Sequence, residues 1–341
     1  MRILVTGAAG FIGSNFVRYV LATHRDDEVT VLDALTYAGN LENLEGLDRD
    51  ARFRFIRGDI ATPADVDGAL AGKSYDALVN FAAETHVDRS LLDAMPFLRT
   101  NVMGVQVLLD AARRHRIRRF LQVSTDEVYG SLGPSGRFTE TSPIQPNNPY
   151  AATKAAADFL VRAAHHSHGL ETVITRCSNN FGPCQFPEKL IPLMFANAME
   201  DKPIPVYGDG MQVRDWIYVM DHSSAVDAVL RRGKAGEIYN IGGNHDVPNL
   251  QIVRTVLQIL GKPESLIRHV ADRPGHDRRY AMDGAKIRET LGWQPQHTFE
   301  NALRETLAWY RDHSAWLARV RSGDYTRYYE TMYGNRPAHK G

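Results

Sequence analysis

The sequence of 341 residues is poor in features that mark secreted, membrane or nucleic-acid-binding proteins. Its two cysteines, Cys177 and Cys184, form no CxxC pair and no disulfide framework, so a reducing compartment is expected. Lys+Arg and Asp+Glu both number 40, and this balance gives no reason to expect nucleic acid or an anionic membrane as a partner. Apolar runs fall short of the roughly 18 residues of a membrane span, and the opening MRILVTGAAG is too short for a signal-peptide core. We therefore expect a cytoplasmic protein.

Short apolar strands alternate with helical stretches along the first half of the chain. Strands are expected at 2–6, 28–33, 52–56, 76–81, 118–124 and 172–176. Helices are expected at about 11–23, 63–71, 95–115 and 150–167. This alternation predicts an α/β fold with a doubly wound parallel Rossmann sheet and helices on both faces.

The pattern changes after about residue 177. Residues 179–192 and 201–210 are rich in proline and glycine, so we expect loops and turns there. A strand near 236–241 could return to the main sheet. Further helices are expected at 249–260, 284–291 and 299–319. The second half is thus predicted to form a smaller α/β lobe, partly interleaved with the first.

Three glycines, Gly7, Gly10 and Gly13, form a GxxGxxG turn between the first strand and the first helix. Such glycines permit close approach of the backbone to a pyrophosphate at the helix N-terminus. Asp33 ends the second strand, where a carboxylate would accept hydrogen bonds from ribose hydroxyls and repel a 2′-phosphate, which favours NAD over NADP. The alternative is a glycine turn without a ligand and an aspartate that merely ends a strand.

A hydroxyl and two acids, Thr125, Asp126 and Glu127, follow the fifth expected strand directly after Ser124. Ligands of doubly wound sheets bind outside the carboxyl ends of the strands. Two adjacent carboxyl groups in a water-poor pocket do not ionise equally, because like charge and burial raise one pKa. The pair could therefore supply an acid and a base, and the alternative is a solvated turn.

A possible catalytic helix begins in the segment NNPYAATK. Asn147 or Asn148 can cap this helix, with Pro149 at its first position. Tyr150 and Lys154 then lie one turn apart on one face. An adjacent ammonium would lower the pKa of the tyrosine and make it a base near neutral pH. The alternative is a surface tyrosine beside a solvated lysine.

Taken together, the glycine turn, Thr125 and Tyr150-x-x-x-Lys154 resemble the extended short-chain dehydrogenase/reductase superfamily. Five segments narrow the resemblance to the dTDP-glucose 4,6-dehydratases of deoxysugar biosynthesis: 35–44, 81–90, 124–130, 179–192 and 272–281. The resemblance covers about residues 1–310. Its most specific feature is the acid pair, since epimerases of the superfamily usually have small residues there.

This resemblance implies an NAD-dependent hydro-lyase that acts on dTDP-glucose by oxidation at carbon 4, elimination of water across carbons 5 and 6, and return of the hydride to carbon 6. Tyr150, helped by Lys154 and hydrogen-bonded with Thr125, would take the proton of the 4-hydroxyl. Glu127 would take the proton of carbon 5, and Asp126 would protonate the departing 6-hydroxyl. A 4-epimerase would not need the two acids, and a non-catalytic dinucleotide-binding module would need neither the acids nor the Tyr/Lys pair.

Two sets of binding residues are implied as well. Those for the cofactor are Phe11, Ile12, Leu35, Thr36, Phe81, Ala82, Ala83, Thr85, Thr100 and Asn180, with Asp59 and Ile60 beside the adenine unless they form a plain turn. Those for the substrate are Thr85, Thr125, Asn179, Glu188, Lys189, Leu190, Pro205, Tyr207, Arg214, Asn249, Arg273 and His276. Arg214 and Arg273 are expected on the diphosphate, because arginine presents a planar fork of donors.

We accordingly predict an NAD-binding Rossmann domain over 1–177 with the strand near 236–241, a substrate-binding lobe over 178–330, and a tail over 331–341 that is frayed from about 334. Alanine-rich faces on the helices near 95–115 and 150–167 allow close packing, and the family pairs such helices into a four-helix bundle, so we expect a homodimer. No metal site is expected, since the histidines of 165–168 lack a partner cluster and suit a solvated helix end.

Overall fold

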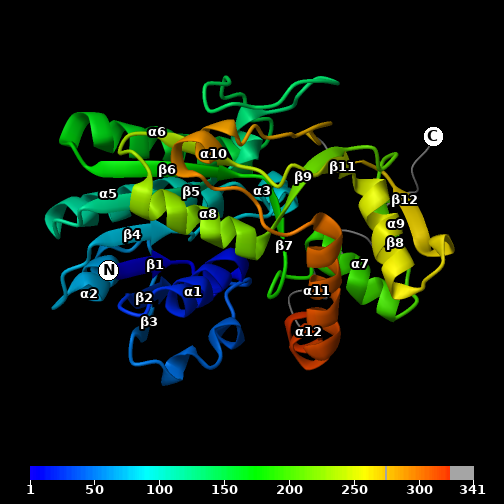
Figure 1. Ribbon diagram of the computed structural model, residues 1–341, viewed down its shortest axis with the longest axis horizontal. Coiled ribbons are helices and arrows are strands. Elements are labelled where there is room, and N and C mark those ends of the chain that lie inside the picture. The colour runs from blue at the N-terminus through cyan, green and yellow to red at the C-terminus, as the bar shows by residue number, and fades with distance from the viewer. Residues whose placement is uncertain (273–274, 323–341) are drawn as a thin grey trace.

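The computed structural model describes residues 1–272 and 275–322. A seven-stranded sheet with the order β10-β6-β5-β4-β1-β2-β3 forms its centre, and all neighbouring strands are parallel (Figure 1). Its strands are β1 (Arg2–Thr6), β2 (Glu28–Asp33), β3 (Phe53–Arg57), β4 (Ala77–Asn80), β5 (Arg119–Thr125), β6 (Glu171–Cys177) and β10 (Ile238–Ile241). The predicted doubly wound parallel sheet is therefore confirmed.

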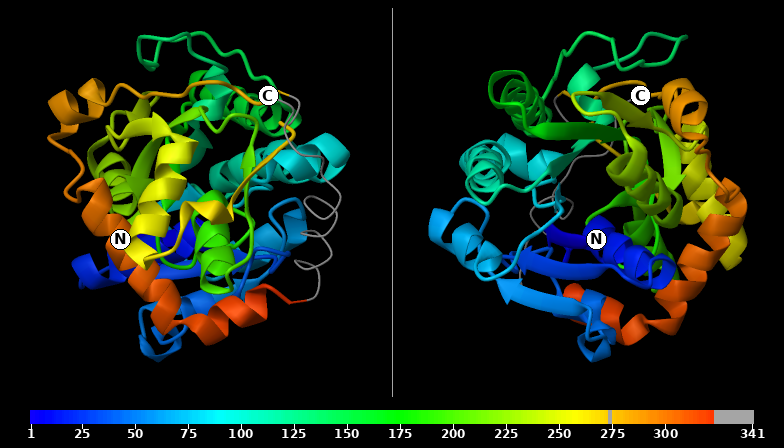
Figure 2. Two further views of the ribbon diagram at one scale, coloured as in Figure 1. Left: turned by 90° about the vertical axis from the view of Figure 1, so that its right-hand side faces the viewer. Right: turned by 60° about the vertical axis from the view of Figure 1, so that its left-hand side comes forward.

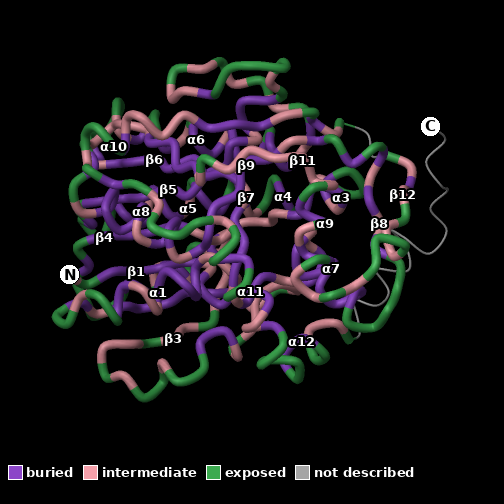
Figure 3. The backbone as a smooth tube through the Cα atoms, turned by 45° about the vertical axis from the view of Figure 1, so that its right-hand side comes forward, coloured by how far each residue is buried: buried purple, intermediate pink, exposed green. Residues whose placement is uncertain are grey.

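Helices cover both faces of this sheet because its strands are apolar on both sides. In β1, Ile3 and Val5 belong to the core on one face, whereas Leu4 between them belongs to the core on the other. The first face is covered by α1 (Phe11–Thr23), α8 (Val219–Arg232) and α10 (Ala285–Leu291), and the second by α2 (Pro63–Leu70), α5 (Val105–Arg114) and α6 (Pro149–His168). Figure 3 shows the contrast between the central strand β5, buried along its length, and the edge strand β3.

A second group of elements lies beside the main sheet, at the right in Figure 1. Its strands are β7 (Asn179–Phe181), β9 (Val213–Tyr218) and β11 (Asp246–Pro248) in one sheet, and β8 (Ile204–Tyr207) and β12 (Ile267–Val270) in another. Its helices are α7 (Leu190–Met199), α9 (Asn249–Leu260), α11 (Phe299–Asp312) and α12 (Ser314–Val320). These elements share a hydrophobic core of their own, which includes Trp216, Ile252 and Tyr310.

Short helical elements complete the fold. They are α3 (Val87–Leu92), α4 (Met95–Phe97), the π-helix η3 (Leu98–Gly104), and the 3-10 helices η1 (Leu41–Leu44), η2 (Leu47–Arg49), η4 (Asp126–Tyr129) and η5 (Glu264–Leu266). The helix expected over 95–115 thus consists of three consecutive elements. None of the helices in residues 1–272 and 275–322 is long and apolar enough to cross a bilayer.

The expectation of loops and turns over 179–192 and 201–210 was wrong in part, because these segments contain β7, the start of α7, and β8. β7 pairs with β9 and β8 with β12, so each strand is formed by a distant partner rather than by local sequence preference. The helix expected over 299–319 is broken at His313 into α11 and α12. The frayed tail that we expected from about 334 lies outside the described residues.

The last described helix returns to the first half of the chain. α12 lies beside the segment that follows β2 in both views of Figure 2. Trp316 Nε1 donates a 3.0 Å hydrogen bond to Asn43 Oδ1, and Arg319 pairs with Glu42. The two groups of elements are therefore connected at this end as well as through β10.

Candidate active site

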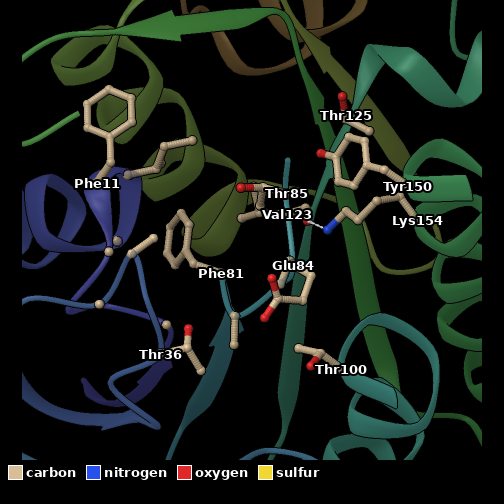
Figure 4. A pocket seen from close by; sticks show the side chains of 18 of the residues that line it. Phe11, Thr36, Phe81, Glu84, Thr85, Thr100, Val123, Thr125, Tyr150 and Lys154 are labelled. Carbon is tan, nitrogen blue, oxygen red and sulfur yellow. Dashed lines mark hydrogen bonds between the residues drawn. The ribbon is translucent and has the colours of Figure 1, made fainter. Parts of the chain in front are cut away.

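A cleft of about 830 Å³ opens at the carboxyl ends of the main-sheet strands. The glycine turn, the ends of β2, β4 and β5, and residues of the segment 177–189 line this cleft. Figure 4 shows part of the lining. The lining includes every predicted cofactor residue except Leu35, which lies next to it in the loop after β2. The predicted catalytic residues and the substrate residues Thr85, Asn179, Glu188 and Lys189 line the same cleft.

The glycine turn has the shape that a dinucleotide requires. Gly7 has φ +71°, and a Cβ there would lie 2.4 Å from the backbone nitrogen of Ala82. A Cβ on Gly13 would lie 2.7 Å from Ala8 Cα. Helix α1 starts directly after Gly10 without a side-chain cap, so its first N–H groups have no side-chain acceptor. These residues fit a pyrophosphate at the helix N-terminus.

Asp33 fixes the loops on either side of this turn. Its Oδ2 accepts a 2.8 Å hydrogen bond from the N–H of Ala9, and its Oδ1 accepts one of 2.8 Å from the N–H of Leu35. Burial raises the pKa of Asp33, and the two N–H groups act in the opposite direction. Each oxygen keeps a further lone pair for a ribose hydroxyl. The carboxylate can therefore hold the loops and a ribose together.

Tyr150 and Lys154 lie one turn apart on α6 and face the end of β5. Lys154 Nζ donates a 2.7 Å hydrogen bond to the carbonyl oxygen of Val123, and the hydroxyls of Tyr150 and Thr125 lie close together (Figure 4). We expected the ammonium to lower the pKa of Tyr150, and this was wrong for the protein alone. Burial raises that pKa well above its usual value, the charge of Glu127 adds to the rise, and the hydrogen bond with Thr125 opposes it. Burial also lowers the pKa of Lys154.

The two adjacent acids have different environments. Asp126 is 2% exposed, and burial together with the charge of Glu127 raises its pKa well above the usual range. Its Oδ1 accepts a 3.2 Å hydrogen bond from Thr125 Oγ1, while within the described residues its Oδ2 has no partner. Glu127 is half-buried on the cleft wall, and its Oε2 accepts a 3.3 Å hydrogen bond from Asn148 Nδ2. The environment of Asp126 therefore favours a protonated acid beside a second carboxyl group.

Asn148, rather than Asn147, caps the helix that carries Tyr150. Asn148 Oδ1 accepts a 2.8 Å hydrogen bond from the N–H of Ala151, and Pro149 occupies the first helical position as expected. Asn147 instead donates a 2.6 Å hydrogen bond to Asp277 Oδ1. The neighbouring asparagines thus connect α6 to two different parts of the molecule.

Several predicted substrate residues do not line the cleft. They are Leu190, Pro205, Tyr207, Arg214, Asn249 and His276, and Arg273 lies outside the described residues. Arg214 is buried, donates a 2.9 Å hydrogen bond to the carbonyl oxygen of Asp277, and lies over the ring of Tyr280 at 4.3 Å. Its charge lowers the pKa of Asp126, which places its guanidinium near the acid pair. A role of these residues in substrate binding stays a prediction.

Sequence reasoning missed a polar cluster around Glu188. Tyr37 Oη donates a 3.0 Å hydrogen bond to Glu188 Oε1, and Arg89 Nε lies 3.5 Å from Glu188 Oε2. The guanidinium of Arg89 lies 3.9 Å from the centre of the Tyr37 ring. Glu84 also points into the cleft (Figure 4), and burial raises its pKa. Arg89 and Glu84 fall in the segment 81–90 that carried part of the resemblance, which was the available signal.

A Rossmann sheet with a glycine turn, a Tyr/Lys pair and two acids at a strand end defines a dinucleotide-dependent sugar-modifying enzyme class. Residues 4–306 match the family described as GDP-mannose 4,6 dehydratase. The chain belongs to this family.

Named relatives agree with this assignment. The chain is 52% identical over 328 residues to a dTDP-glucose 4,6-dehydratase of Streptomyces niveus, covering 95% of this chain and 97% of that protein. It is 51% identical over 340 residues to the enzyme of that name from Xanthomonas campestris pv. campestris, covering 94% and 96%.

Solved structures give the same assignment. A dTDP-glucose 4,6-dehydratase from Streptomyces venezuelae, solved with NAD bound, is 50% identical and superimposes with a TM-score of 0.91 over 94% of this chain and 100% of that chain. A UDP-glucose 4-epimerase of Thermus thermophilus, in complex with NAD, is 31% identical with a TM-score of 0.85 over 91% and 99%. The fold is thus shared with epimerases, whereas the higher identity is with dehydratases.

Proposed function

We propose that this protein is an NAD-dependent dTDP-glucose 4,6-dehydratase that forms dTDP-4-keto-6-deoxyglucose and water for deoxysugar biosynthesis. The observation that carries the proposal is the buried Asp126, whose raised pKa favours a protonated acid, beside Glu127 on the cleft wall. An elimination needs one group that takes a proton and another that gives one. The relatives of about 50% identity that bear this name support the same conclusion.

Each side chain of the site has a task in this reaction. Tyr150, in hydrogen-bond contact with Thr125 and one turn from Lys154, takes the proton of the 4-hydroxyl. Glu127 takes the proton of carbon 5, which the 4-ketone makes acidic, and Asp126 gives its proton to the departing 6-hydroxyl, so that water leaves. When hydride returns to carbon 6, a proton returns to carbon 5. Bound NAD supplies the oxidation at carbon 4 and the reduction at carbon 6, so no external oxidant or reductant is needed.

The binding residues follow from the cleft. Gly7, Gly10, Gly13 and Asp33 would hold the cofactor at the start of α1, together with the other cofactor residues predicted from the sequence. Glu188 and Lys189 line the same cleft as the acid pair and would contact the sugar or its diphosphate. We assign the thymidine diphosphate carrier from the relatives named dTDP-glucose 4,6-dehydratase.

We also propose that two copies associate through the helices next to the cleft. Four exposed apolar side chains lie on α4, η3 and α6. Leu98 and Phe159 lie outside the cleft lining, whereas Met95 and Met103 also line the cleft. α6 packs beside α4, η3 and α5, so this apolar surface can bury itself in a four-helix bundle. We also propose a cytoplasmic location. Both cysteines are free and buried, as a reducing compartment allows.

The decisive experiment uses dTDP-glucose deuterated at carbon 4. A dehydratase yields a 4-keto-6-deoxy product with the deuterium at carbon 6 and needs no added reductant. Mass spectrometry and NMR of the product locate the label. Recovery of dTDP-galactose with no loss of water would assign the protein to the epimerases instead.

A further inference from the structure

Asn148 connects the start of helix α6 to the carboxylate of Glu127. Its Oδ1 accepts the 2.8 Å hydrogen bond from the N–H of Ala151, and its Nδ2 lies 3.3 Å from Glu127 Oε2. The side chain is 6% exposed. Because a backbone N–H occupies Oδ1, the amide NH₂ is the end that faces the carboxylate. One side chain therefore contacts both Glu127 and the first turn of the helix that carries Tyr150.

The chain on each side of this contact is held in place. The N–H of Gln145 donates a 3.0 Å hydrogen bond to the carbonyl oxygen of Val128, the residue after Glu127. Gly130 has φ +78°, and a Cβ there would lie 2.2 Å from the carbonyl oxygen of Gln145. The segment that leads into α6 therefore packs directly on the turn that carries Glu127, and Asn148 cannot move away without disturbing that packing.

Two phenols and a second acid lie around the Glu127 carboxylate, and the guanidinium of Arg214 lies over the ring of one of these phenols, Tyr280, at 4.3 Å. The charge of the carboxylate raises the pKa of both Tyr150 and Tyr280, so the two phenols lie near it, and the charge also raises the pKa of Asp126. The amide of Asn148 is the side-chain hydrogen-bond donor that the structure shows for this carboxylate. A hydrogen bond from an N–H group to a carboxylate contributes more free energy than a hydrogen bond between two neutral groups.

We propose that Asn148 is a positioning residue for the elimination step. Its NH₂ holds the Glu127 carboxylate against the cleft wall, while its Oδ1 fixes the first turn of the helix that carries Tyr150 and Lys154. Removal of the proton from carbon 5 depends on the first contact, whereas oxidation at carbon 4 depends on the second. This inference rests on the proposed function and adds a residue that acts through Glu127.

Two substitutions separate these contacts, because aspartate and serine are both good N-caps and neither replaces the amide NH₂. Asn148→Asp places a second carboxyl group against Glu127, and we expect carbon-5 proton exchange to slow about 10- to 100-fold. Asn148→Ser removes the donor alone, and we expect a loss of about three- to tenfold. Asn148→Ser should keep the wild-type Tm, whereas Asn148→Asp should lower it, because two carboxyl groups then meet at a buried position. Both variants should reduce bound NAD on mixing with dTDP-glucose at a rate within about twofold of wild type.

The measurements use the NAD-loaded enzyme. Stopped-flow absorbance follows the reduced cofactor, and mass spectrometry in deuterated water follows exchange at carbon 5. Asn148→Ala is the control that loses both contacts, so it should slow exchange as the serine variant does and also lower the Tm.

Two results would overturn the inference. One is wild-type exchange in Asn148→Asp, and the other is an equal slowing of cofactor reduction and exchange in that variant. A wild-type enzyme that forms no 4-keto-6-deoxy sugar would refute the proposed function itself, and this result is read before any variant is compared.

Discussion

Lys154 Nζ donates its 2.7 Å hydrogen bond to the carbonyl oxygen of Val123, two residues before Thr125 (Figure 4). This bond ties helix α6 to the end of strand β5, so the tyrosine and the acid pair keep a fixed separation. It also satisfies one donor of a buried ammonium. The division of tasks between these two elements is open to direct tests.

Glu127→Gln should separate oxidation from elimination. The amide keeps the volume of the carboxylate but cannot take a proton, so carbon-5 exchange should fall by a factor of about 10² or more while bound NAD is still reduced. Stopped-flow absorbance and solvent-deuterium exchange measure the two steps. Asp126→Asn is the matched variant: it should keep carbon-5 exchange and lose water elimination. Failure of Glu127→Gln to reduce the cofactor would contradict our assignment.

Asp33→Asn should weaken the preference for NAD. The substitution removes the negative charge that would repel a 2′-phosphate and that would accept the ribose hydroxyls, while an amide oxygen remains for one backbone N–H. We expect NAD affinity to fall about 10- to 100-fold and the affinity ratio of NAD to NADP to shrink. Calorimetric titration of nucleotide-free protein measures both constants, and an unchanged ratio would show that Asp33 only holds the loops.

Phe159→Glu should convert the proposed dimer to a monomer. Phe159 is 57% exposed on α6, outside the cleft lining, and a carboxylate there would be desolvated in a helix bundle. Sedimentation velocity at micromolar concentration compares the variant with wild type. Met199→Glu, on the exposed side of α7, is the control that should leave the assembly unchanged. A monomeric wild type would refute the dimer directly.

His222 should make the protein sensitive to acid. The ring is fully buried in α8, neither nitrogen has a hydrogen-bond partner in the described part of the chain, and burial lowers its pKa from 6.5 to about 3. Below pH 6.5 the unfolded chain binds a proton here that the folded protein does not bind until about pH 3. Stability therefore rises with pH across this window, and above it the ring is neutral in both states and adds no pH dependence.

The measurement is the free energy of unfolding in denaturant at several pH values between about 4 and about 7. His222→Leu should reduce the loss at the acid end by an amount on the order of a few kcal/mol. His166→Leu, at an exposed position, is the control that should keep the wild-type slope. An equal slope in wild type and His222→Leu would show that other groups set the acid limit.

The sequence predicted the elements of the main sheet well because its strands are short segments that are mostly apolar or, as in β3, alternate between apolar and polar residues. α1 and α9 begin and end at the predicted residues, since apolar periodicity and the residues at their ends agree. The start of α6 followed from Asn and Pro before Tyr150. In the second group, strands of three or four residues such as β7 and β8 form through partners far along the chain, and no local pattern predicts them.

Residue types and spacing predicted which side chains of the acid pair and the Tyr/Lys pair line the site, but not how the fold surrounds them. The unequal environments of Asp126 and Glu127 follow from adjacency and burial, and the structure shows this inequality. The raised pKa of Tyr150 depends on how deeply α6 is buried and on the approach of Glu127, which spacing does not reveal. Likewise Tyr37 and Glu188 meet across 151 positions of sequence, so only the folded chain brings them together.

The position of β10 constrains how the protein is made. Residues 178–237 separate β6 from β10, its neighbour on the far side of the sheet. Until residue 241 has left the ribosome, β6 is an open edge of the nascent sheet, with N–H and C=O groups able to pair with another chain. The strand next to the catalytic β5 is thus protected only late in synthesis. Truncation after residue 177 would leave this edge open permanently, and the Rossmann half should aggregate when produced alone.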